Sequence, residues 1–298
     1  MTLTQNLSQL SVVIPVYNEG LHLEERVDHF ITVLDAVVGS GRWEICLINN
    51  GSADNTATII DNLSTRSPNI IGHALPNPNY GLAIRHGVIQ ANHAFIYIVD
   101  LDQWDDAFIQ WAWRYHRSYD LIISSKRADP SINRQSRLRF MLSWGLNAAL
   151  QLLFAFPGSD THGQKLLNRE SLEQILEKTK ADRGQYDVEL VVRTLRAGKS
   201  VIELPVPYEE MRPARNALVK KVLWNTWALS KLAWRLHSLK SQSVQLRRIS
   251  RSDVENGRGF SDDAPQTLVD FSAVLTLTRA RERRPANLQW RGLFWRTL

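Results

Sequence analysis

Short apolar runs alternate with amphipathic segments through the first part of the chain. Five runs have the length and the β-branched or apolar character of strands: SVVIPV, WEICLIN, NIIGHAL, AFIYIVD and DLIISS, at residues 11–16, 43–49, 69–75, 94–100 and 120–125. Between them, residues 23–38, 54–66, 82–93 and 106–118 carry apolar side chains at helical spacing. This alternation predicts a doubly wound α/β domain with a mostly parallel central sheet and helices on both faces.

Polar clusters follow most of these strands. The first strand leads into YNEG, the second into NNGSADNT, the fourth into DLDQWDD and the fifth into SKR. Ligands of open α/β sheets bind at the carboxyl ends of the strands, where loops are free to vary and helix N-termini point at the edge. We therefore expect the functional site along that edge.

The pattern changes after Arg127. An apolar helix is predicted at 137–156, followed by a segment at 158–168, two further helices and a strand at 199–208. Residues 218–239 predict an amphipathic, Trp-rich helix that also carries Lys and Arg side chains. Residues 240 to about 266 are polar and typical of a linker, and the rest is a basic tail with interleaved Trp and Phe. The expected units are thus 1–217, 218–239 and 240–298.

Composition narrows the class of protein without naming its ligand. The 298 residues are 44% hydrophobic, which supplies a core and excludes a disordered or fibrous chain. A net charge of +6 fits an anionic small substrate, a nucleic acid or an anionic membrane surface equally. The single cysteine, Cys46, excludes an internal disulfide and is expected to be a core residue. Without a secretory signal or an apolar stretch of bilayer length, we expect a cytoplasmic chain with no transmembrane helix.

The fourth strand ends in a group of aspartates. Asp100 and Asp102 are two positions apart, so in extended geometry they share one face and repel each other unless a cation lies between them. Oxygen ligands select a hard ion, Mg²⁺ or Mn²⁺. The alternative is that aspartates cap the helix that begins near Ala107, and we prefer this alternative for Asp105 and Asp106.

Several motifs in order, over about residues 11–217, resemble glycosyltransferase family 2, in particular its dolichol-phosphate mannose synthase-like branch of polyprenyl-phosphate sugar transferases. They are SVVIPVYNE, INNGSADNT, NYGLAIRHG, VDLDQ, SSKR, SDTHGQKLLNRE and YDVELVVRTLRAGKSVIELPVPYEEMRPARN. The resemblance implies a Rossmann-like nucleotide-diphospho-sugar transferase (GT-A) fold, with the catalytic domain at 1–217.

The resemblance also implies site residues. Counterparts of Pro15, Tyr17 and Glu19 line the nucleotide pocket, and the counterpart of Asn50 contacts the base. The metal ligands implied by VDLDQ are Asp100, Asp102 and Gln103. The residues similar to the family's acceptor-side, pyrophosphate-side and donor-closing contacts are Arg127, Arg139, Ser143 and Arg212, with Arg215 as a second closing arginine.

Three departures from the family pattern bear on activity. The lysine expected shortly after the final arginine is not in register, and Lys220 and Lys221 are only nearby. Asn49 and Asn50 stand where the family usually has paired aspartates, and an amide donates as well as accepts, so the preferred base or its affinity is expected to differ. His162 and Gln164 replace a small residue and a frequent Phe on either side of a glycine. A lone His162 is more often a turn residue than a metal ligand.

The implied reaction is inverting, metal-dependent transfer of a sugar from a nucleotide diphosphate sugar to an acceptor, for which we expect a polyprenyl phosphate. The metal held by Asp102, together with Arg127, would neutralise the leaving diphosphate. A lipid phosphate is already anionic and needs no general base, whereas a hydroxyl acceptor would need one, for which Asp187 and Glu189 are candidates. The structural alternatives, which we prefer, are a helix cap for Asp187 and an arginine partner for Glu189.

A lipid acceptor would bring the protein to a membrane. Trp and Lys are favoured at bilayer interfaces, so residues 218–239 predict peripheral attachment to the inner, cytoplasmic face. The alternative is that the tryptophans pack onto the domain. Three other functions stay open: a soluble transferase with a saccharide hydroxyl acceptor, a nucleotide-sugar-binding protein without turnover, and a nucleic-acid-binding protein. No nucleic-acid-binding fold is recognised in the body of the chain, so nucleic acid is not an expected partner.

Overall fold

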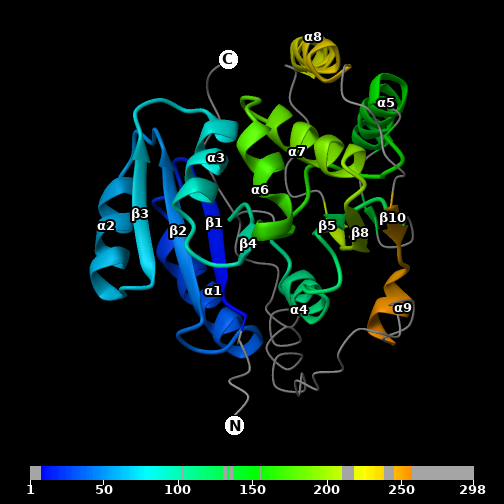
Figure 1. The fold of residues 1–298 in the computed structure, drawn as a ribbon. Helices are drawn as coiled ribbons and strands as arrows, with labels where there is room; N and C mark the ends of the chain where they lie inside the picture. The colour runs from blue at the N-terminus through cyan, green and yellow to red at the C-terminus, as the bar shows by residue number, and fades with distance from the viewer. Residues whose placement is uncertain are drawn as a thin grey trace. The chain divides into compact units, whose positions relative to one another are not determined.

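A single large sheet forms the centre of the molecule (Figure 1). The computed structural model describes residues 8–101, 104–129, 133–134, 137–154, 156–209, 218–237 and 245–256. The strand order is β10-β8-β5-β7-β4-β1-β2-β3. The bounds are β1 (Leu10–Val16), β2 (Trp43–Asn50), β3 (Ile70–Leu75), β4 (Phe95–Ile98), β5 (Leu121–Ser125), β7 (Lys165–Asn168), β8 (Ser200–Pro205) and β10 (Gln245–Arg248). The predicted α/β architecture is confirmed.

Strand β7 runs against its neighbours. It is antiparallel to β4 and to β5, whereas the other pairs in this sheet are parallel. Lys165, its first residue, pairs with Ile98 of β4 and Ile123 of β5. The chain that precedes β7 therefore arrives at the edge where β4 and β5 end. A separate two-stranded sheet joins β6 (Asn133–Arg134) to β9 (Tyr208–Glu209).

Helices cover both faces of the sheet (Figure 1). Two buried clusters, one on each face, define the layers. The first face carries α1 (Leu23–Val37), α2 (Thr56–Arg66), α4 (Asp106–Arg114) and α9 (Arg251–Glu255). The second face carries α3 (Tyr80–Gln90), α5 (Arg137–Phe154), α6 (Arg169–Lys178), α7 (Gln185–Arg196) and α8 (Leu218–Leu236). Helix α8 falls within the segment predicted to be a Trp-rich helix.

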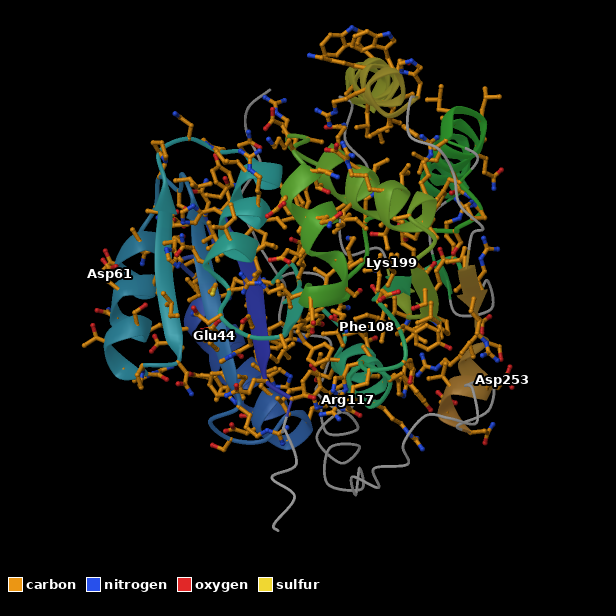
Figure 2. The ribbon with its side chains drawn as sticks, viewed as in Figure 1. Glu44, Asp61, Phe108, Arg117, Lys199 and Asp253 are labelled. Carbon is orange, nitrogen blue, oxygen red and sulfur yellow. The ribbon has the colours of Figure 1, made fainter. Side chains whose placement is uncertain are left out.

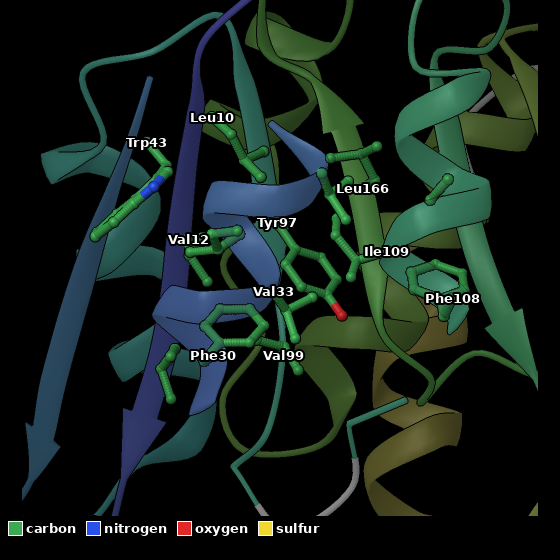
Figure 3. Close-up of a cluster of buried hydrophobic side chains, with 14 of the residues drawn as sticks. Leu10, Val12, Phe30, Val33, Trp43, Tyr97, Val99, Phe108, Ile109 and Leu166 are labelled. Atoms are coloured by element: carbon green, nitrogen blue, oxygen red, sulfur yellow. The ribbon is translucent and has the colours of Figure 1, made fainter. Parts of the chain in front are cut away.

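Aromatic rings fill the first cluster (Figure 3). The Tyr97 ring of β4 lies 5.9 Å from the Phe30 ring of α1 and 6.1 Å from the Phe108 ring of α4. The Tyr97 hydroxyl donates to Oε1 of Gln164, so the polar tip of a fully buried ring has a partner. The unusual Gln164 thus has a structural reason, because a phenylalanine there could not accept this bond.

Cys46 lies in the second cluster and is completely buried. Burial, with a smaller effect of Glu44, raises the pKa of its thiol to about 12. The expectation that Cys46 is a core residue is confirmed.

Glu44 is a buried carboxylate near the amino-terminal end of β2 (Figure 2). Its oxygens accept from Ser11 Oγ (2.6 Å) and from the backbone and side-chain nitrogens of Asn92 (2.7 and 2.9 Å). Burial alone would raise the pKa of Glu44, but these hydrogen bonds outweigh it and hold the pKa below its usual value. Glu44 therefore joins strands and is not a candidate for catalysis.

The segment expected to be a linker contains a strand. Residues 245–248 pair in parallel with β8, from Gln245 opposite Ser200 to Arg248 opposite Glu203. Val254 of the following short helix, α9, is buried in the first cluster. The linker prediction is wrong for residues 245–256, because tertiary pairing makes a strand of a sequence whose own pattern is polar.

Candidate active site

The loops after β1 and β2 are bonded to each other at the carboxyl edge of the sheet. Asn18, with a φ of 53°, donates its backbone N–H to Ser52 Oγ (3.0 Å), and its side-chain oxygen accepts from Ala53 N–H (2.8 Å). Asn adopts such a left-handed φ more readily than most residues. This pairing fixes the loop that carries the half-buried Tyr17 and Glu19.

Glu19 is held from two sides. Its backbone N–H donates to Thr56 Oγ1 (3.0 Å), and its carboxylate pairs with Arg26 at 3.3 Å. Nearby, Asp54 accepts from the backbone N–H groups of Gly20 (3.1 Å) and Thr56 (3.0 Å). Burial alone would raise the pKa of Asp54, but hydrogen bonds from Thr56 and Gly20 outweigh it and lower the pKa. These bonds hold the loop that carries Glu19, one of the residues expected to line a nucleotide pocket.

The two asparagines at the end of β2 use their oxygens for backbone bonds. Asn49 accepts from Ser52 N–H at 3.0 Å, and Asn50 accepts from Asn79 N–H at 2.7 Å. Both side chains are buried. An aspartate could accept the same bonds, so what the amides add at these positions is an N–H donor.

Asp100 is bonded to the first turn of α3, which also supports Asn50. The Tyr80 hydroxyl donates to Asp100 Oδ2 at 3.2 Å, and Tyr80 is the residue directly after Asn79, the N-cap of this helix. Asn79 donates in turn to Asp182 at 3.0 Å. The beginning of α3 thus braces an expected base contact and an expected metal ligand together.

Asp105 and Asp106 belong to the helix that follows. Asp105 is the N-cap of α4 and accepts from the backbone N–H groups of Ala107 (2.8 Å) and Phe108 (3.3 Å). Asp106 lies in the first turn and pairs with His29 at 2.9 Å. The preferred structural alternative, a helix cap, is confirmed for Asp105, whereas Asp106 lies in the first turn and has His29 as its partner.

Arg127 follows β5 in a turn held by Ser125. The Ser125 hydroxyl oxygen accepts from the backbone N–H groups of Arg127 and Ala128, each at 3.1 Å. Ser125 and the turn that follows it lie at the carboxyl end of β5, beside the chain that enters β7. Arg127 therefore belongs to the same edge of the sheet as Asp100.

Asp187 is an interior residue. Its carboxylate pairs with Lys165 at 2.8 Å, and the two side chains are 2% and 1% exposed. Lys165 also donates to the Gly163 carbonyl at 2.7 Å. The helix cap that we preferred for Asp187 is wrong, because the N-cap of α7 is Gly184 and no side chain makes a cap hydrogen bond there. Asp187 lies in the first turn of α7, and its partner is Lys165.

Glu189 has the structural role that we preferred. It is completely buried and pairs with Arg193 and with Arg235 of α8, each at 2.7 Å. It also accepts from the backbone N–H groups of Lys180 (2.9 Å) and Ala181 (2.7 Å). His162 is a turn residue as expected, since its N–H donates to Asp160 at 3.0 Å.

Apart from Asp187, the expected site residues fall into two groups. The structure brings one group to the carboxyl edge of the sheet: Pro15, Tyr17, Glu19, Asn50, Asp100 and Arg127. Arg139 and Ser143 lie in α5, but their side chains are outside the described residues, as are Asp102, Gln103 and Arg212 altogether. Among the residues that the structure does describe, no three His, Cys, Asp or Glu side chains gather closely enough to hold a metal.

Sequence reasoning missed Lys165 and Glu203. Lys165 is the one charged residue of the four in β7, and a charge inside a strand-like run signals an internal ion pair. Glu203 is completely buried in the apolar strand β8 and accepts from both the N–H (2.7 Å) and the hydroxyl (2.6 Å) of Ser159. The same signal, a carboxylate between apolar neighbours, could have found it.

The family model for glycosyl transferase family 2 matches residues 11–176, which is more than half of the chain. The chain therefore belongs to this family. A curated relative, dolichyl-phosphate beta-glucosyltransferase ALG5A from Trichomonas vaginalis, is 29% identical over 213 residues, or 68% of this chain and 66% of that protein. The chain thus spans about two thirds of the length of this relative. Its name agrees with the branch of the family that the motifs resemble.

Solved structures show the same fold. Glucosyl-3-phosphoglycerate synthase from Mycobacterium tuberculosis, with Mn²⁺, UDP-glucose and phosphoglyceric acid, gives a TM-score of 0.57 at 18% identity, over 83% of this chain and 91% of that one. Mannosyltransferase PcManGT from Pyrobaculum calidifontis, with GDP-Man and Mn²⁺, gives 0.56 at 18% identity, over 80% and 67%. At these identities the likeness shows the fold alone, and the expected GT-A fold is confirmed.

Helix α8 has a buried face and an exposed face. Leu229 and Leu232 are buried in the second cluster, whereas Trp227 and Trp234 are 62% and 76% exposed. The Nζ of Lys231 lies 5.5 Å from the centre of the Trp227 ring. The alternative in which the tryptophans pack onto the domain is wrong for Trp227 and Trp234. In the described ranges, no helix combines the length and apolar character needed to cross a bilayer.

Proposed function

We propose that this chain is a metal-dependent inverting glycosyltransferase that moves a sugar from a nucleotide diphosphate sugar to a polyprenyl phosphate. One observation carries the proposal. Asn50 and Asp100 come from different strands, yet both are bonded to the start of α3, through Asn79 and Tyr80. The expected base contact and the expected metal ligand are therefore both bonded to the start of one helix, at the carboxyl edge of the sheet, where ligands of such folds usually bind.

The metal in this proposal is Mg²⁺ or Mn²⁺. Carboxylate and amide oxygens, as in Asp100, Asp102 and Gln103, are the donors that hard cations prefer. Such an ion supplies positive charge to a leaving diphosphate. Arg127 is proposed to add a second, fixed positive charge on the same edge.

Two observations support a lipid phosphate acceptor. Asp187 is buried in an ion pair with Lys165, and an acceptor that is already anionic needs no general base. The exposed Trp227 and Trp234, with Lys231 between them, give α8 the surface of a helix that lies on an anionic bilayer. The name of the Trichomonas relative points the same way.

The donor is tested by calorimetric titration of UDP-sugars and GDP-sugars with and without Mn²⁺. We expect binding that depends on Mn²⁺, is lost in Asp100→Ala and Asp102→Ala, and is retained in Asp61→Ala. Asp61 is a suitable control because it is exposed on α2 (Figure 2). If the folded protein binds no nucleotide sugar, the proposed transferase activity is wrong.

The acceptor is tested by following the sugar from the donor that binds. We expect transfer to a short polyprenyl phosphate and none to the matching polyprenol or to free saccharides. Transfer to a hydroxyl would favour the alternative of a soluble transferase. Donor binding without transfer to any acceptor would favour a binding protein.

Membrane attachment is tested by sedimentation with vesicles that contain phosphatidylglycerol. We expect the variant Trp227→Ala/Trp234→Ala to bind these vesicles about tenfold more weakly than the natural chain. Ile89→Ala is the matched control, since Ile89 is an apolar residue of α3 that is 64% exposed. Equal binding of the two variants would remove α8 from the proposal.

A further inference from the structure

An ion pair between the half-exposed Arg248 and the buried Glu203 joins the outer strand β10 to its neighbour β8. The Nε of Arg248 donates to Oε2 of Glu203 at 3.0 Å, and another guanidinium nitrogen donates to the Pro157 carbonyl. The Glu203 side chain is 1% exposed and that of Arg248 is 46% exposed. A carboxylate buried this deeply is costly without a cationic partner. Arg248 therefore compensates Glu203 and ties β10 to the segment at Pro157.

Glu203 is hydrogen-bonded to Ser159, which in turn contacts Ser125. It accepts from the Ser159 N–H (2.7 Å) and from the Ser159 hydroxyl (2.6 Å). Since that hydroxyl has one proton, its oxygen must accept in the 2.7 Å contact with Ser125 Oγ. The Ser125 oxygen is then the acceptor for the backbone N–H groups of Arg127 and Ala128, both at 3.1 Å. We call this series of hydrogen bonds, from Arg248 through Glu203 and Ser159 to Ser125, the relay. The donor and the acceptor of each of its bonds are determined.

The residues of the relay are buried and tightly packed. Ser125 and Glu203 are completely buried, and Ser159 is 8% exposed. A Cβ on Gly158 would lie 2.7 Å from Glu203 Oε1 and 2.2 Å from the Phe156 ring. Tight packing of this kind transmits a displacement at one end to the other.

We propose that Arg248 is a positioning residue for the turn that presents Arg127, so that the strand after α8 is part of the catalytic unit. The inference rests on the proposed function, in which Arg127 contacts the donor diphosphate. Arg248 acts through Glu203, Ser159 and Ser125, and it touches no reacting group. The catalytic unit would then extend beyond the expected boundary at residue 217 to include β10.

The test compares nucleotide diphosphate with nucleoside monophosphate in the full chain. With Mn²⁺, the tighter of UDP and GDP is titrated into the natural protein, Arg248→Ala, Arg248→Lys and Arg127→Ala, and the corresponding monophosphate is titrated in parallel. We expect Arg248→Ala and Arg127→Ala each to weaken diphosphate binding about tenfold, and Arg248→Ala to change monophosphate binding less than about twofold. Arg248→Lys should recover much of the affinity, and the two alanine substitutions should not be additive.

The neighbouring arginine provides the control. Arg247 is exposed on the same strand, so Arg247→Ala should bind both nucleotides as the natural protein does. If Arg248→Ala does not fold, Ser159→Ala removes only the hydroxyl of the relay and should still weaken the diphosphate selectively. Unchanged diphosphate binding in a folded relay variant, or equal loss of diphosphate and monophosphate, overturns the inference.

Hydrogen exchange separates this inference from the proposed function, because it needs no ligand. Amide exchange in residues 122–129 and 156–163 should become faster in the folded relay variants and stay unchanged in Arg247→Ala. Unchanged exchange in these segments overturns the positioning role. Faster exchange in a protein that binds no nucleotide would retain the structural relay, refute its role in donor binding, and refute the proposed function separately.

Discussion

The ion pair between Lys165 and Asp187 can be tested as a structural element and, at the same time, as a candidate general base. The two side chains are 1% and 2% exposed, and their charged atoms are 2.8 Å apart. Asp187→Leu leaves the ammonium buried with the Gly163 carbonyl, at 2.7 Å, as a neutral acceptor. Removing one partner of such a pair costs about 3–5 kcal/mol, against a typical total stability of about 5–15 kcal/mol.

Urea unfolding followed by circular dichroism measures this cost. We expect Asp187→Leu and Lys165→Met each to lower the free energy of unfolding by about 3 kcal/mol, which corresponds to a fall in Tm of roughly 10 °C for a domain of this size. The double variant should recover most of the loss, since apolar side chains then replace both charges. The coupling between the two substitutions should therefore be about 5 kcal/mol, close to the two single losses taken together.

Two results would refute this reasoning. Single variants that lose less than about 1 kcal/mol would show that the pair is not a buried, mutually dependent unit. A variant of Asp187 that keeps its stability and donor binding but loses transfer to a hydroxyl acceptor would identify Asp187 as a base. Loss of stability in both single variants with recovery in the double variant assigns it to the core.

Two further predictions concern other parts of the fold. Burial, with Arg117 and Arg42 nearby, lowers the pKa of His116 to about 4 from an ordinary 6.5. As the pH falls, His116 is therefore protonated in the unfolded chain before it is protonated in the folded one. The neutral, buried His116 contributes up to about 3 kcal/mol to the free energy of unfolding; this contribution is fully present above pH 6.5 and is lost as the pH falls towards 4. His116→Gln should flatten the decrease in urea midpoint between pH 7 and pH 5, and an unaltered decrease would exclude His116 as its source. Gly163→Ala should destabilise the protein strongly, because the added Cβ would lie 1.9 Å from the backbone oxygen of Ser124. Gly145→Ala, whose Cβ would have nothing within 4 Å, should be neutral or stabilising by about 0.5–1 kcal/mol. Equal thermal unfolding of the two variants would contradict this prediction.

The first half of the fold could be predicted because its pattern is local. Apolar strands such as 11–16 and 43–49 alternate with helices, and their polar ends predicted the position of Tyr17, Asn50 and Asp100 at one edge. Strands β7 and β10 escaped prediction for a physical reason. Each has four residues, and Lys165 or Arg247 and Arg248 break the apolar pattern. Only pairing with neighbours far along the chain makes them strands.

Side-chain roles were predictable where one turn of chain decides them and not where the partner is distant. Asp105 caps the helix that it begins, so its sequence position was sufficient. The partner of Asp187 is Lys165, on a strand whose direction the sequence did not reveal. The substitution of Gln164 is understandable only beside Tyr97, 67 positions away.

Strand β10 also bears on the solubility of the protein. In the described part of the chain it is an outer strand of the sheet, and it is short and carries two arginines, features that oppose pairing with a second sheet. Its neighbour in the sheet, β8, is a six-residue strand that is buried almost throughout. A chain shortened to end after α8 would present the free N–H and C=O groups of β8 to other molecules. In the full chain, residues 245–248 would therefore keep copies of the protein from pairing through β8, in addition to positioning Arg127 within one copy.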